Sequence, residues 1–305
     1  MTDQAAGLRG NRGERTERRR PGRPASRLAE RWTTVAGIQA FYRESPDPPH
    51  APVMMHVSGF GLSGHYLLPT AEALMDEFHT LVPDLPGFGR SGRTAGSLDV
   101  PQLARAAAAF LDRQGIQKVT LVCNSMGCPV ICEFAHLYPE RLERAVLVSP
   151  AGGLHNQPLT RAVRQIISDG TREPARLFRV VVPDYLRFGV PNTFRLFEAL
   201  TRYPTLRRLL DLDVPTLAVV GNRDPLLPSP ARVREFAELK EHHTLFVVID
   251  GAAHAINFSH PGELANLIRL FMADQQIVDD PSSRGTAKVY ELYRGSNLPS
   301  TGTWR

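Results

Sequence analysis

The sequence has few cysteines and no long apolar segment. Cys123, Cys128 and Cys132 are the only cysteines among 305 residues, and an odd number within ten positions does not make a disulfide framework. Three thiols with no histidine at ligand spacing also make a poor zinc site. No run approaches the ~18 apolar residues that a membrane-crossing helix needs. We therefore expect no disulfide, no metal and no membrane span, in a reducing, cytoplasmic setting.

The net charge of +5 comes from one end of the chain. Residues 1–31 contain nine arginines and four acidic residues, whereas the remaining 27 basic and 27 acidic residues balance. This stretch lacks the 7–15-residue apolar segment of a secretory signal. Its low hydrophobicity predicts a disordered, Arg-rich tail over residues 1–31, which is either a solvated extension or a contact for an anionic surface. We expect no nucleic-acid binding by the folded domain.

Apolar strands alternate with helices over most of the remaining chain. The pattern predicts strands at 32–36, 38–44, 52–58, 79–84, 118–123, 144–149, 215–221 and 244–249. It predicts helices at 67–78, 101–114, 126–138, 231–240 and 261–273. Such alternation implies a mostly parallel, eight-stranded sheet with helices on both faces. We predict an α/β core formed by residues 32–150 and 213–275.

The alternation stops between residues 151 and 212. This stretch has helical patches rich in Arg and Leu and no cluster of strand-forming residues, so we predict a helical cap inserted after strand 6. Its apolar side chains would cover a pocket, which favours a substrate with a hydrophobic moiety. An inward arginine could bind a substrate carboxylate, but the pattern does not single one out. Residues 276–305 are polar and are predicted to form a C-terminal extension.

The clearest catalytic motif lies where a buried strand meets a helix. The segment Leu121-Val122-Cys123-Asn124-Ser125-Met126-Gly127 resembles the nucleophile elbow G-x-S-x-G, whose tight turn lifts the serine hydroxyl above the carboxyl edge of the sheet. Gly127 keeps the pattern. Cys123 replaces the first glycine, and we expect it to crowd the turn. Ser125 is the candidate nucleophile.

Two further strand ends supply the partners that a serine nucleophile needs. Asp224 follows the strand at 215–221, and His254 follows the strand at 244–249, so both would lie at the same edge as Ser125. The histidine serves as general base, and the acid orients it. Asp250 is a competing acid, but it lies on the loop of His254 and would have to fold back. We therefore favour Asp224.

The whole set resembles the α/β-hydrolase superfamily over roughly residues 32–275. Ser58-Gly59-Phe60-Gly61 stands where the family usually has His-Gly, and the segments 84–91 and 138–141 also match. The resemblance implies the α/β-hydrolase fold, no cofactor, and an oxyanion hole from the backbone N–H groups of Phe60 and Met126. Such donors are worth about 3–4 kcal/mol each. Ser58 in the family's histidine position changes the local hydrogen bonding.

A narrower similarity points to the meta-cleavage-product hydrolases, which split carbon–carbon bonds. It comprises Asn124–Gly127, Tyr138-Pro139 and Ser149–Gly153 and covers about thirty residues. The chain departs from that family at Phe60 and at Ala255, where the family has a Gly-rich loop and usually a Trp. Haloalkane dehalogenases and epoxide hydrolases resemble the fold but use Asp at the elbow, so Ser125 favours acyl-transfer chemistry.

We therefore predict a cofactor-free serine hydrolase that acts on a small-molecule carboxylic ester or lactone with a hydrophobic moiety through an acyl-enzyme on Ser125. Three alternatives stay open. The first is carbon–carbon bond hydrolysis. The second is acyl transfer to an alcohol or amine. The third is a non-catalytic, ligand-binding homologue, against which the complete Ser125, Asp224 and His254 set argues. The sequence does not determine the oligomeric state or the natural substrate.

Overall fold

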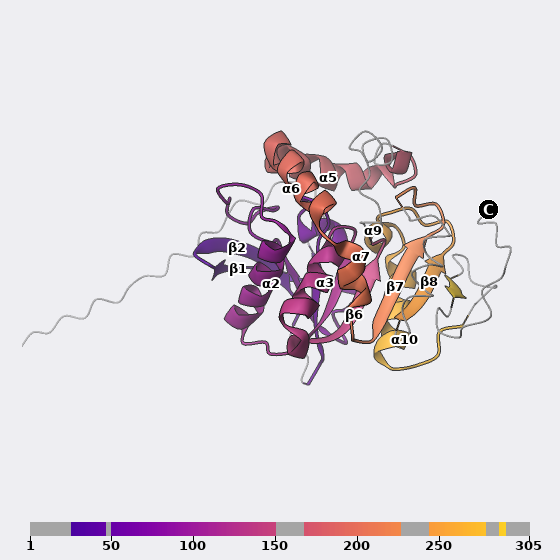
Figure 1. Cartoon of the computed structure of the whole chain (residues 1–305). Helices are drawn as coiled ribbons and strands as arrows, with labels where there is room; N and C mark the ends of the chain where they lie inside the picture. The colour runs from indigo at the N-terminus through magenta and orange to yellow at the C-terminus, as the bar shows by residue number, and fades with distance from the viewer. Residues whose placement is uncertain (1–25, 47–49, 151–167, 227–243, 279–286, 291–305) are drawn as a thin grey trace, which may run out of the picture.

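The described part of the chain contains one mixed sheet with helices on both faces (Figure 1). The computed structural model describes residues 26–46, 50–150, 168–226, 244–278 and 287–290. The strands in these residues are β1 (Ala29–Val35), β2 (Ile38–Glu44), β3 (Val53–Val57), β4 (His79–Pro83), β5 (Val119–Asn124), β6 (Leu142–Val148), β7 (Thr216–Gly221), β8 (Thr244–Ile249) and β9 (Ala287–Tyr290). No helix in them is both long and apolar enough to cross a membrane.

The strand order is β1-β2-β4-β3-β5-β6-β7-β8-β9. Strands β3 to β8 run parallel, and β1, β2 and β9 pair antiparallel at the two sides. The predicted mostly parallel, eight-stranded sheet is confirmed. β9 adds a ninth strand, which the sequence did not predict because four residues in a polar segment give no periodic signal. It pairs with β8 and so covers what would otherwise be an open sheet edge.

Helices cover both faces of the sheet. In chain order the helical elements are η1 (Gly64–Leu67), α1 (Leu68–Leu74), α2 (Val100–Gln114), α3 (Gly127–Leu137), η2 (Pro139–Arg141), α5 (Ala175–Phe188), α6 (Val190–Arg202), α7 (Thr205–Leu210), α9 (Ile256–Ser259) and α10 (Pro261–Met272). Helices α2 and α3 pack on one face, and α1 and α10 pack on the other. The predicted helix at 231–240 lies outside the described residues.

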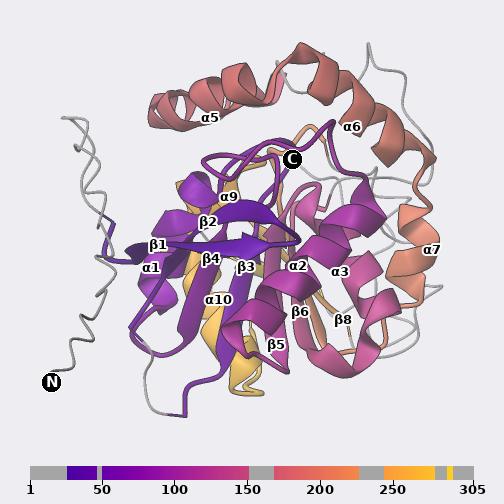
Figure 2. The same ribbon diagram turned by 90° about the vertical axis from the view of Figure 1, so that its left-hand side faces the viewer.

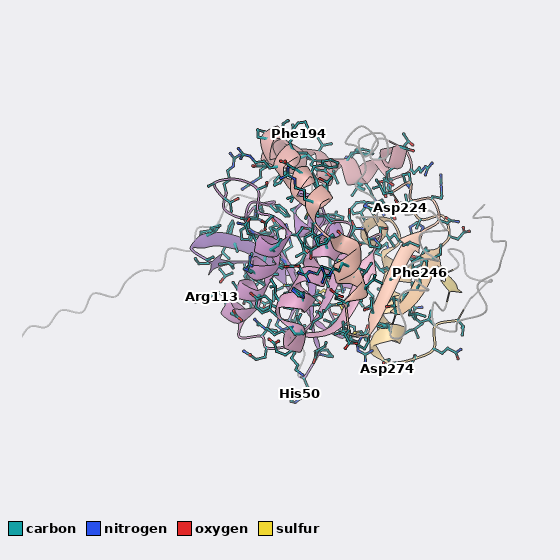
Figure 3. All side chains as sticks on the ribbon, in the orientation of Figure 1. His50, Arg113, Phe194, Asp224, Phe246 and Asp274 are labelled. Carbon is teal, nitrogen blue, oxygen red and sulfur yellow. The ribbon has the colours of Figure 1, made fainter. Side chains whose placement is uncertain are left out.

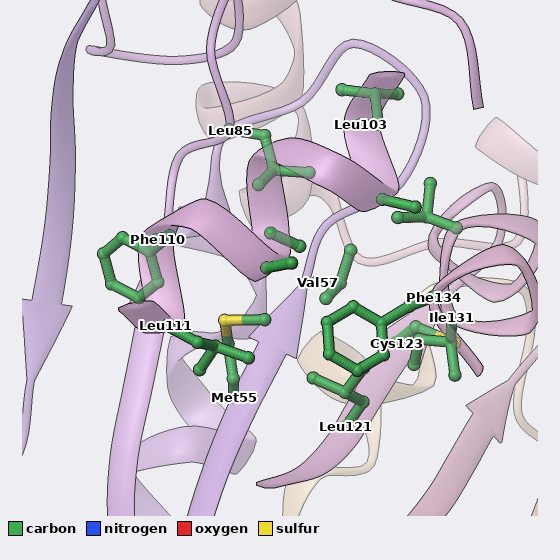
Figure 4. Close-up of a cluster of buried hydrophobic side chains, with 14 of the residues drawn as sticks. Met55, Val57, Leu85, Leu103, Phe110, Leu111, Leu121, Cys123, Ile131 and Phe134 are labelled. Atoms are coloured by element: carbon green, nitrogen blue, oxygen red, sulfur yellow. The ribbon is translucent and has the colours of Figure 1, made fainter. Parts of the chain in front are cut away.

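The alternation of side chains along each strand explains the two hydrophobic layers. Met55 and Leu121 point to the layer of Phe110 and Phe134, as Figure 4 shows. Their neighbours Met54 and Val122 point to the layer that contains residues of α1 and α10. Because successive side chains of a strand face opposite sides, a continuous apolar run is what a sheet buried on both faces requires.

The first strand begins inside the stretch that we predicted to be a tail. β1 starts at Ala29, and the preceding Leu28 is buried against residues of η1 and α1. The hydroxyl of Ser26 donates a hydrogen bond to Glu72 Oε1 at 2.6 Å. A single apolar side chain among arginines is a weak sequence signal, which is why the strand was predicted to start later, at Trp32.

Helices α5, α6 and α7 lie between β6 and β7 in the sequence. Figures 1 and 2 both show α5 and α6 forming a layer beyond one end of the sheet. Asp184 of α5, together with Arg172 and Glu173 just before it, forms hydrogen bonds with the loops that follow β3, β7 and β8. This end is therefore the carboxyl edge of the parallel strands. α7 returns the chain along α3, where Arg208 Nε lies 3.0 Å from Glu133 Oε2. Residues 151–167 lie outside the described part.

Candidate active site

Ser125 occupies a strained turn between β5 and α3. Its backbone has a φ of 57°, in the left-handed region that residues other than glycine rarely adopt. Two hydrogen bonds hold this conformation, from Ser125 N to Val148 O at 2.9 Å and from Cys128 N to Ser125 O at 3.0 Å. A serine held in this way at a strand-to-helix turn has the geometry of a nucleophile elbow.

The neighbouring positions show how a cysteine fits where glycine is usual. The Cys123 thiol lies 2.8 Å from the Cys128 thiol and 3.6 Å from Val146 O, so it packs between α3 and β6, and both thiols are free. The crowding that we expected from Cys123 affects Gly127, where there is no room for a side chain. A Cβ there would lie 2.9 Å from Cys123 Cβ and 2.7 Å from Val57 O.

Replacing Gly127 with alanine is therefore expected to destabilise the protein by about 1–3 kcal/mol, because the added methyl group meets rigid backbone. Urea denaturation monitored by circular dichroism measures this change. Gly262 in α10 is the matched control, since a Cβ there has open space, and its alanine variant should be neutral or up to about 1 kcal/mol more stable. Equal stability of the two variants would contradict the assigned packing of the elbow.

His254 and Asp224 meet at the carboxyl edge of the sheet. His254 Nδ1 lies 2.7 Å from Asp224 Oδ2, and the Asp224 side chain is almost fully buried. Asp224 Oδ1 also accepts a hydrogen bond from Leu226 N at 2.8 Å, which fixes the carboxylate. The competing acid, Asp250, is exposed and contacts the Asn222 amide instead. Figure 3 shows Asp224 on the side of the molecule that faces α5.

Two opposing effects set the pKa of His254. Burial lowers the pKa of the imidazole, but the charge of Asp224 and its hydrogen bond to the ring outweigh burial, and Asp169 and Glu173 add to them. The pKa of His254 is therefore raised above 6.5. A ring whose Nδ1 is held by a carboxylate presents Nε2 as the proton-accepting nitrogen.

Two further carboxylates hold the backbone of the His254 loop. Asp169 Oδ1 accepts a hydrogen bond from His254 N at 3.2 Å, and Glu173 Oε1 accepts one from Ala255 N at 2.6 Å. Burial raises the pKa of Asp169 and raises that of Glu173 to about 7. Arg172, which lies between these two acids in the sequence, donates a hydrogen bond from Nη1 to Arg223 O at 2.7 Å, and Arg223 is the neighbour of Asp224. Sequence reasoning missed all three because each contact spans more than fifty residues.

A buried hydrogen-bond network joins the three loops of the site. Gly59 N donates to Tyr66 Oη at 2.7 Å, and this hydroxyl donates to Asn124 Oδ1 at 3.0 Å. Asn124 Nδ2 in turn donates to His254 O at 3.0 Å. The loop after β3, the elbow and the His254 loop are thus tied together around Ser125. No motif in the sequence pointed to Tyr66, although Asn124 lies within the elbow motif.

The two predicted oxyanion donors belong to segments that flank Ser125. Met126 follows Ser125 at the N-cap of α3, where backbone N–H groups lack an acceptor within the helix. Phe60 follows Gly59, whose Cβ, if present, would lie 3.3 Å from Ser125 Cβ. Ser58 supplies a local hydrogen bond of its own, because its hydroxyl donates to Leu62 O at 2.7 Å and closes the loop.

Helix α5 packs directly on this loop. Phe188, at the end of α5, makes edge-to-face contacts with Phe60 and Phe88 at centroid distances of 6.4 and 5.3 Å. Asp184 Oδ2 accepts hydrogen bonds from Ser63 N and Ser63 Oγ at 2.9 and 2.5 Å. A cleft next to Phe188 is lined by Pro86, Phe88, Arg93, Leu98, Arg187 and Asn192, among others.

None of the described residues form a group of three or more His, Cys, Asp or Glu side chains that could hold a metal ion. The three cysteines form no disulfide, and all three are buried.

Comparison with known proteins places the chain among hydrolases. A family model described as the alpha/beta hydrolase family matches residues 53–267. The poly(3-hydroxyalkanoate) depolymerase of Ectopseudomonas oleovorans is 25% identical over 252 residues, which cover 76% of this chain and 88% of that protein. The pimeloyl-[acyl-carrier protein] methyl ester esterase of Neisseria meningitidis is 25% identical over 272 residues, which cover 80% and 83%.

A solved structure shows the same fold. The thermophilic esterase of Thermogutta terrifontis superposes with a TM-score of 0.64 and 23% identity, and the match covers 81% of this chain and 98% of that one.

Proposed function

The chain belongs to the alpha/beta hydrolase family, and from this premise we propose that it is a cofactor-free serine hydrolase that cleaves a carboxylic ester or lactone. The proposal rests above all on the His254–Asp224 hydrogen bond of 2.7 Å at the same sheet edge as the strained Ser125 turn. The named activities of the depolymerase and the methyl ester esterase support ester chemistry.

In the proposed reaction Ser125 Oγ attacks the carbonyl carbon while His254 Nε2 takes the hydroxyl proton. Asp224 stabilises the imidazolium, and the N–H groups of Phe60 and Met126 bind the negative oxygen of the tetrahedral intermediate. The alcohol leaves with the proton from His254, and an acyl-enzyme on Ser125 remains. A water molecule, deprotonated by His254, then attacks the acyl group, and collapse of the second intermediate releases the acid and restores Ser125.

We propose that residues 151–212 act as a cap over this reaction. Phe188 and Asp184 of α5 contact the loop of Phe60, and Asp169 and Glu173 hold the loop of His254. The apolar contacts of α5 favour a substrate with a hydrophobic moiety, because a pocket lined by such side chains gains most from burying apolar surface. Arg187 is a cap arginine at the cleft beside Phe188.

Hydrolysis of a p-nitrophenyl ester series from acetate to decanoate tests the proposed function. We expect turnover with an optimum of acyl chain length that reflects the size of the covered pocket. Absence of turnover across the series, in a protein shown to be folded by circular dichroism, would contradict the esterase proposal and favour carbon–carbon hydrolysis or ligand binding.

Replacing Glu173 with glutamine is expected to shift the acid limb of the kcat/KM profile to lower pH. The charges of Asp224, Asp169 and Glu173 all raise the pKa of His254. Glu173 carries this charge to the extent that it is ionised, which its pKa of about 7 places in the upper part of the acid limb. Removing the charge lowers the pKa of His254, so in that range the imidazole becomes an unprotonated base at lower pH. Glutamine can still accept the hydrogen bond from Ala255 N. The profile is measured with a p-nitrophenyl ester over about pH 5–9.

Glu140 in η2 supplies the control, because it is exposed and lies beyond the opposite end of β6. Its glutamine variant should leave the profile unchanged. Glu173→Ala should instead lower stability by about 1–3 kcal/mol, because it leaves the buried Ala255 N–H without its partner. A Glu173→Gln profile that coincides with wild type would rule out an electrostatic effect of Glu173 on His254.

A further inference from the structure

The outer surface of α5 and α6 exposes an unusual number of large apolar side chains. Phe178, Val182, Leu186, Val190 and Phe194 are between 44% and 79% exposed. Only two other large apolar side chains in the described residues, Trp32 and Val278, are comparably exposed. Figure 3 shows Phe194 at the outer side of α6, beyond the rest of the molecule. Clustered exposure of this kind marks an interaction surface.

The spacing of these residues separates them from the packing face of each helix. Phe178, Val182 and Leu186 recur every four residues and form one stripe along α5, while Leu177, Val180 and Phe188 of the same helix are buried. On α6, Val190 and Phe194 are likewise one turn apart, and Leu196 is the buried residue. The core side of both helices is therefore already occupied, and the exposed stripe is a second apolar face.

The charges around the stripe are mostly positive. Residues 175–202 contain five arginines and only two acids, Asp184 and Glu198. Asp184 binds Ser63 of the core, and Glu198 pairs with Arg202 at 2.6 Å, so neither acid adds free negative charge to the outer surface. Arg179, Arg187 and Arg195 are exposed, so the two helices carry a net positive charge at the surface. Arg187 also donates from Nη2 to Arg90 O at 3.3 Å, a neutral acceptor that does not cancel its charge.

We infer that the outer face of α5 and α6 docks on an anionic lipid surface. An amphipathic helix that carries exposed Phe, Leu and Val next to arginines inserts the apolar side chains at the level of the lipid headgroups, and the arginines contact their negative charges. Helices α5 and α6 form the outermost layer at this end of the sheet (Figures 1 and 2), and the stripe is on their exposed side, so it suits a broad interface. A second copy fits less well, because it would bring the arginines of two such faces together.

Docking in this orientation would turn the candidate active site toward the lipid surface. The same layer contacts the loops of Phe60 and His254 from its inner side. The docked protein would therefore hold the Ser125 edge of the sheet toward the lipid surface, where apolar esters are concentrated.

Cosedimentation of the full chain with vesicles tests the inference independently of catalysis. We expect binding to phosphatidylcholine vesicles that contain about 30% phosphatidylglycerol, and weaker binding to pure phosphatidylcholine or at high salt. Leu186→Ser and Leu186→Ser/Phe194→Ser should each reduce partitioning, the double variant by roughly tenfold or more. Val278→Ser removes a comparably exposed apolar side chain elsewhere and should bind like wild type. The melting temperature of each variant checks folding.

Failure of the wild-type protein to bind anionic vesicles would overturn the inference, and so would equal losses for Val278→Ser and Leu186→Ser. Light scattering without vesicles gives the other decisive outcome. A dimer that Leu186→Ser/Phe194→Ser dissociates would assign this face to contact between copies of the chain instead.

Discussion

Replacing Ser125 with alanine is expected to lower kcat for ester hydrolysis by about 10⁴–10⁶-fold, the range found when a catalytic serine or its base is removed. The loss arises because alanine has no hydroxyl oxygen to form the acyl-enzyme, whereas we expect substrate binding to be retained. Stability should change little, since alanine and serine pay a similar cost for the φ of 57°. Steady-state kinetics with a p-nitrophenyl ester and urea denaturation measure both effects.

Ser149 offers a closely matched control. It follows β6, the neighbouring parallel strand, and it also has a positive φ, of 46°. Its side chain is buried, and its position does not place it in the proposed reaction. Ser149→Ala should therefore keep nearly full activity. A Ser125→Ala variant that turns over ester as fast as Ser149→Ala would refute the assignment of Ser125 as nucleophile.

Replacing Asp224 with asparagine is expected to reduce kcat by about 10⁴-fold with the fold intact. The carboxylate accepts the proton of His254 Nδ1, and the amide nitrogen of asparagine can only donate to that atom. The imidazole would then hold its proton on Nε2, where it could no longer accept the proton of Ser125. The loss should be largest where His254 is neutral in the wild-type enzyme, which a pH profile measures.

Asp250→Asn separates the two acids that the sequence left in competition. Asp250 is exposed and contacts Asn222, so its replacement should leave kcat within a few-fold of wild type. If Asp250→Asn caused the large loss and Asp224→Asn did not, the acid of the site would be Asp250, and the His254 loop would have to rearrange before reaction.

Strand ends made the candidate site predictable. In a parallel sheet the carboxyl ends of all strands meet at one edge, so the positions of Ser125, Asp224 and His254 after three apolar strands already place them together. The apolar runs themselves located eight strands, because a strand buried on both faces leaves a continuous signal. These local patterns were sufficient for the fold and for placing the three candidate residues after strands of the same sheet.

The supporting contacts could not be predicted, because they depend on side chains far apart in sequence. Tyr66 reaches Asn124 across 58 residues, and Glu173 reaches Ala255 across 82. In the sequence, Glu173 is one acid among several in an arginine-rich stretch, and nothing local distinguishes it from a solvated surface residue. Its burial and its raised pKa arise only when α5 packs over the loops of the core.

The start of β1 was also predicted incorrectly, although the residues concerned are close together in the sequence. Leu28 is surrounded in sequence by Arg27, Glu30 and Arg31, which suggested a continuing tail. In the fold, Arg31 pairs with Glu44 across the β1–β2 hairpin, and Leu28 enters a hydrophobic cluster with residues of η1 and α1. A charged segment can therefore be part of the sheet when its charges have partners on the next strand.

Labelling of the folded protein with a fluorophosphonate, followed by peptide mass spectrometry, tests the central claim most directly. The reagent forms a stable adduct only with a serine that an adjacent base has activated. We predict one adduct per chain, on the peptide that contains Ser125, and its loss in Ser125→Ala and strong reduction in Asp224→Asn. Absence of an adduct on the folded wild-type chain, or an adduct on another residue, would contradict the proposal that Ser125 is the nucleophile of a serine hydrolase.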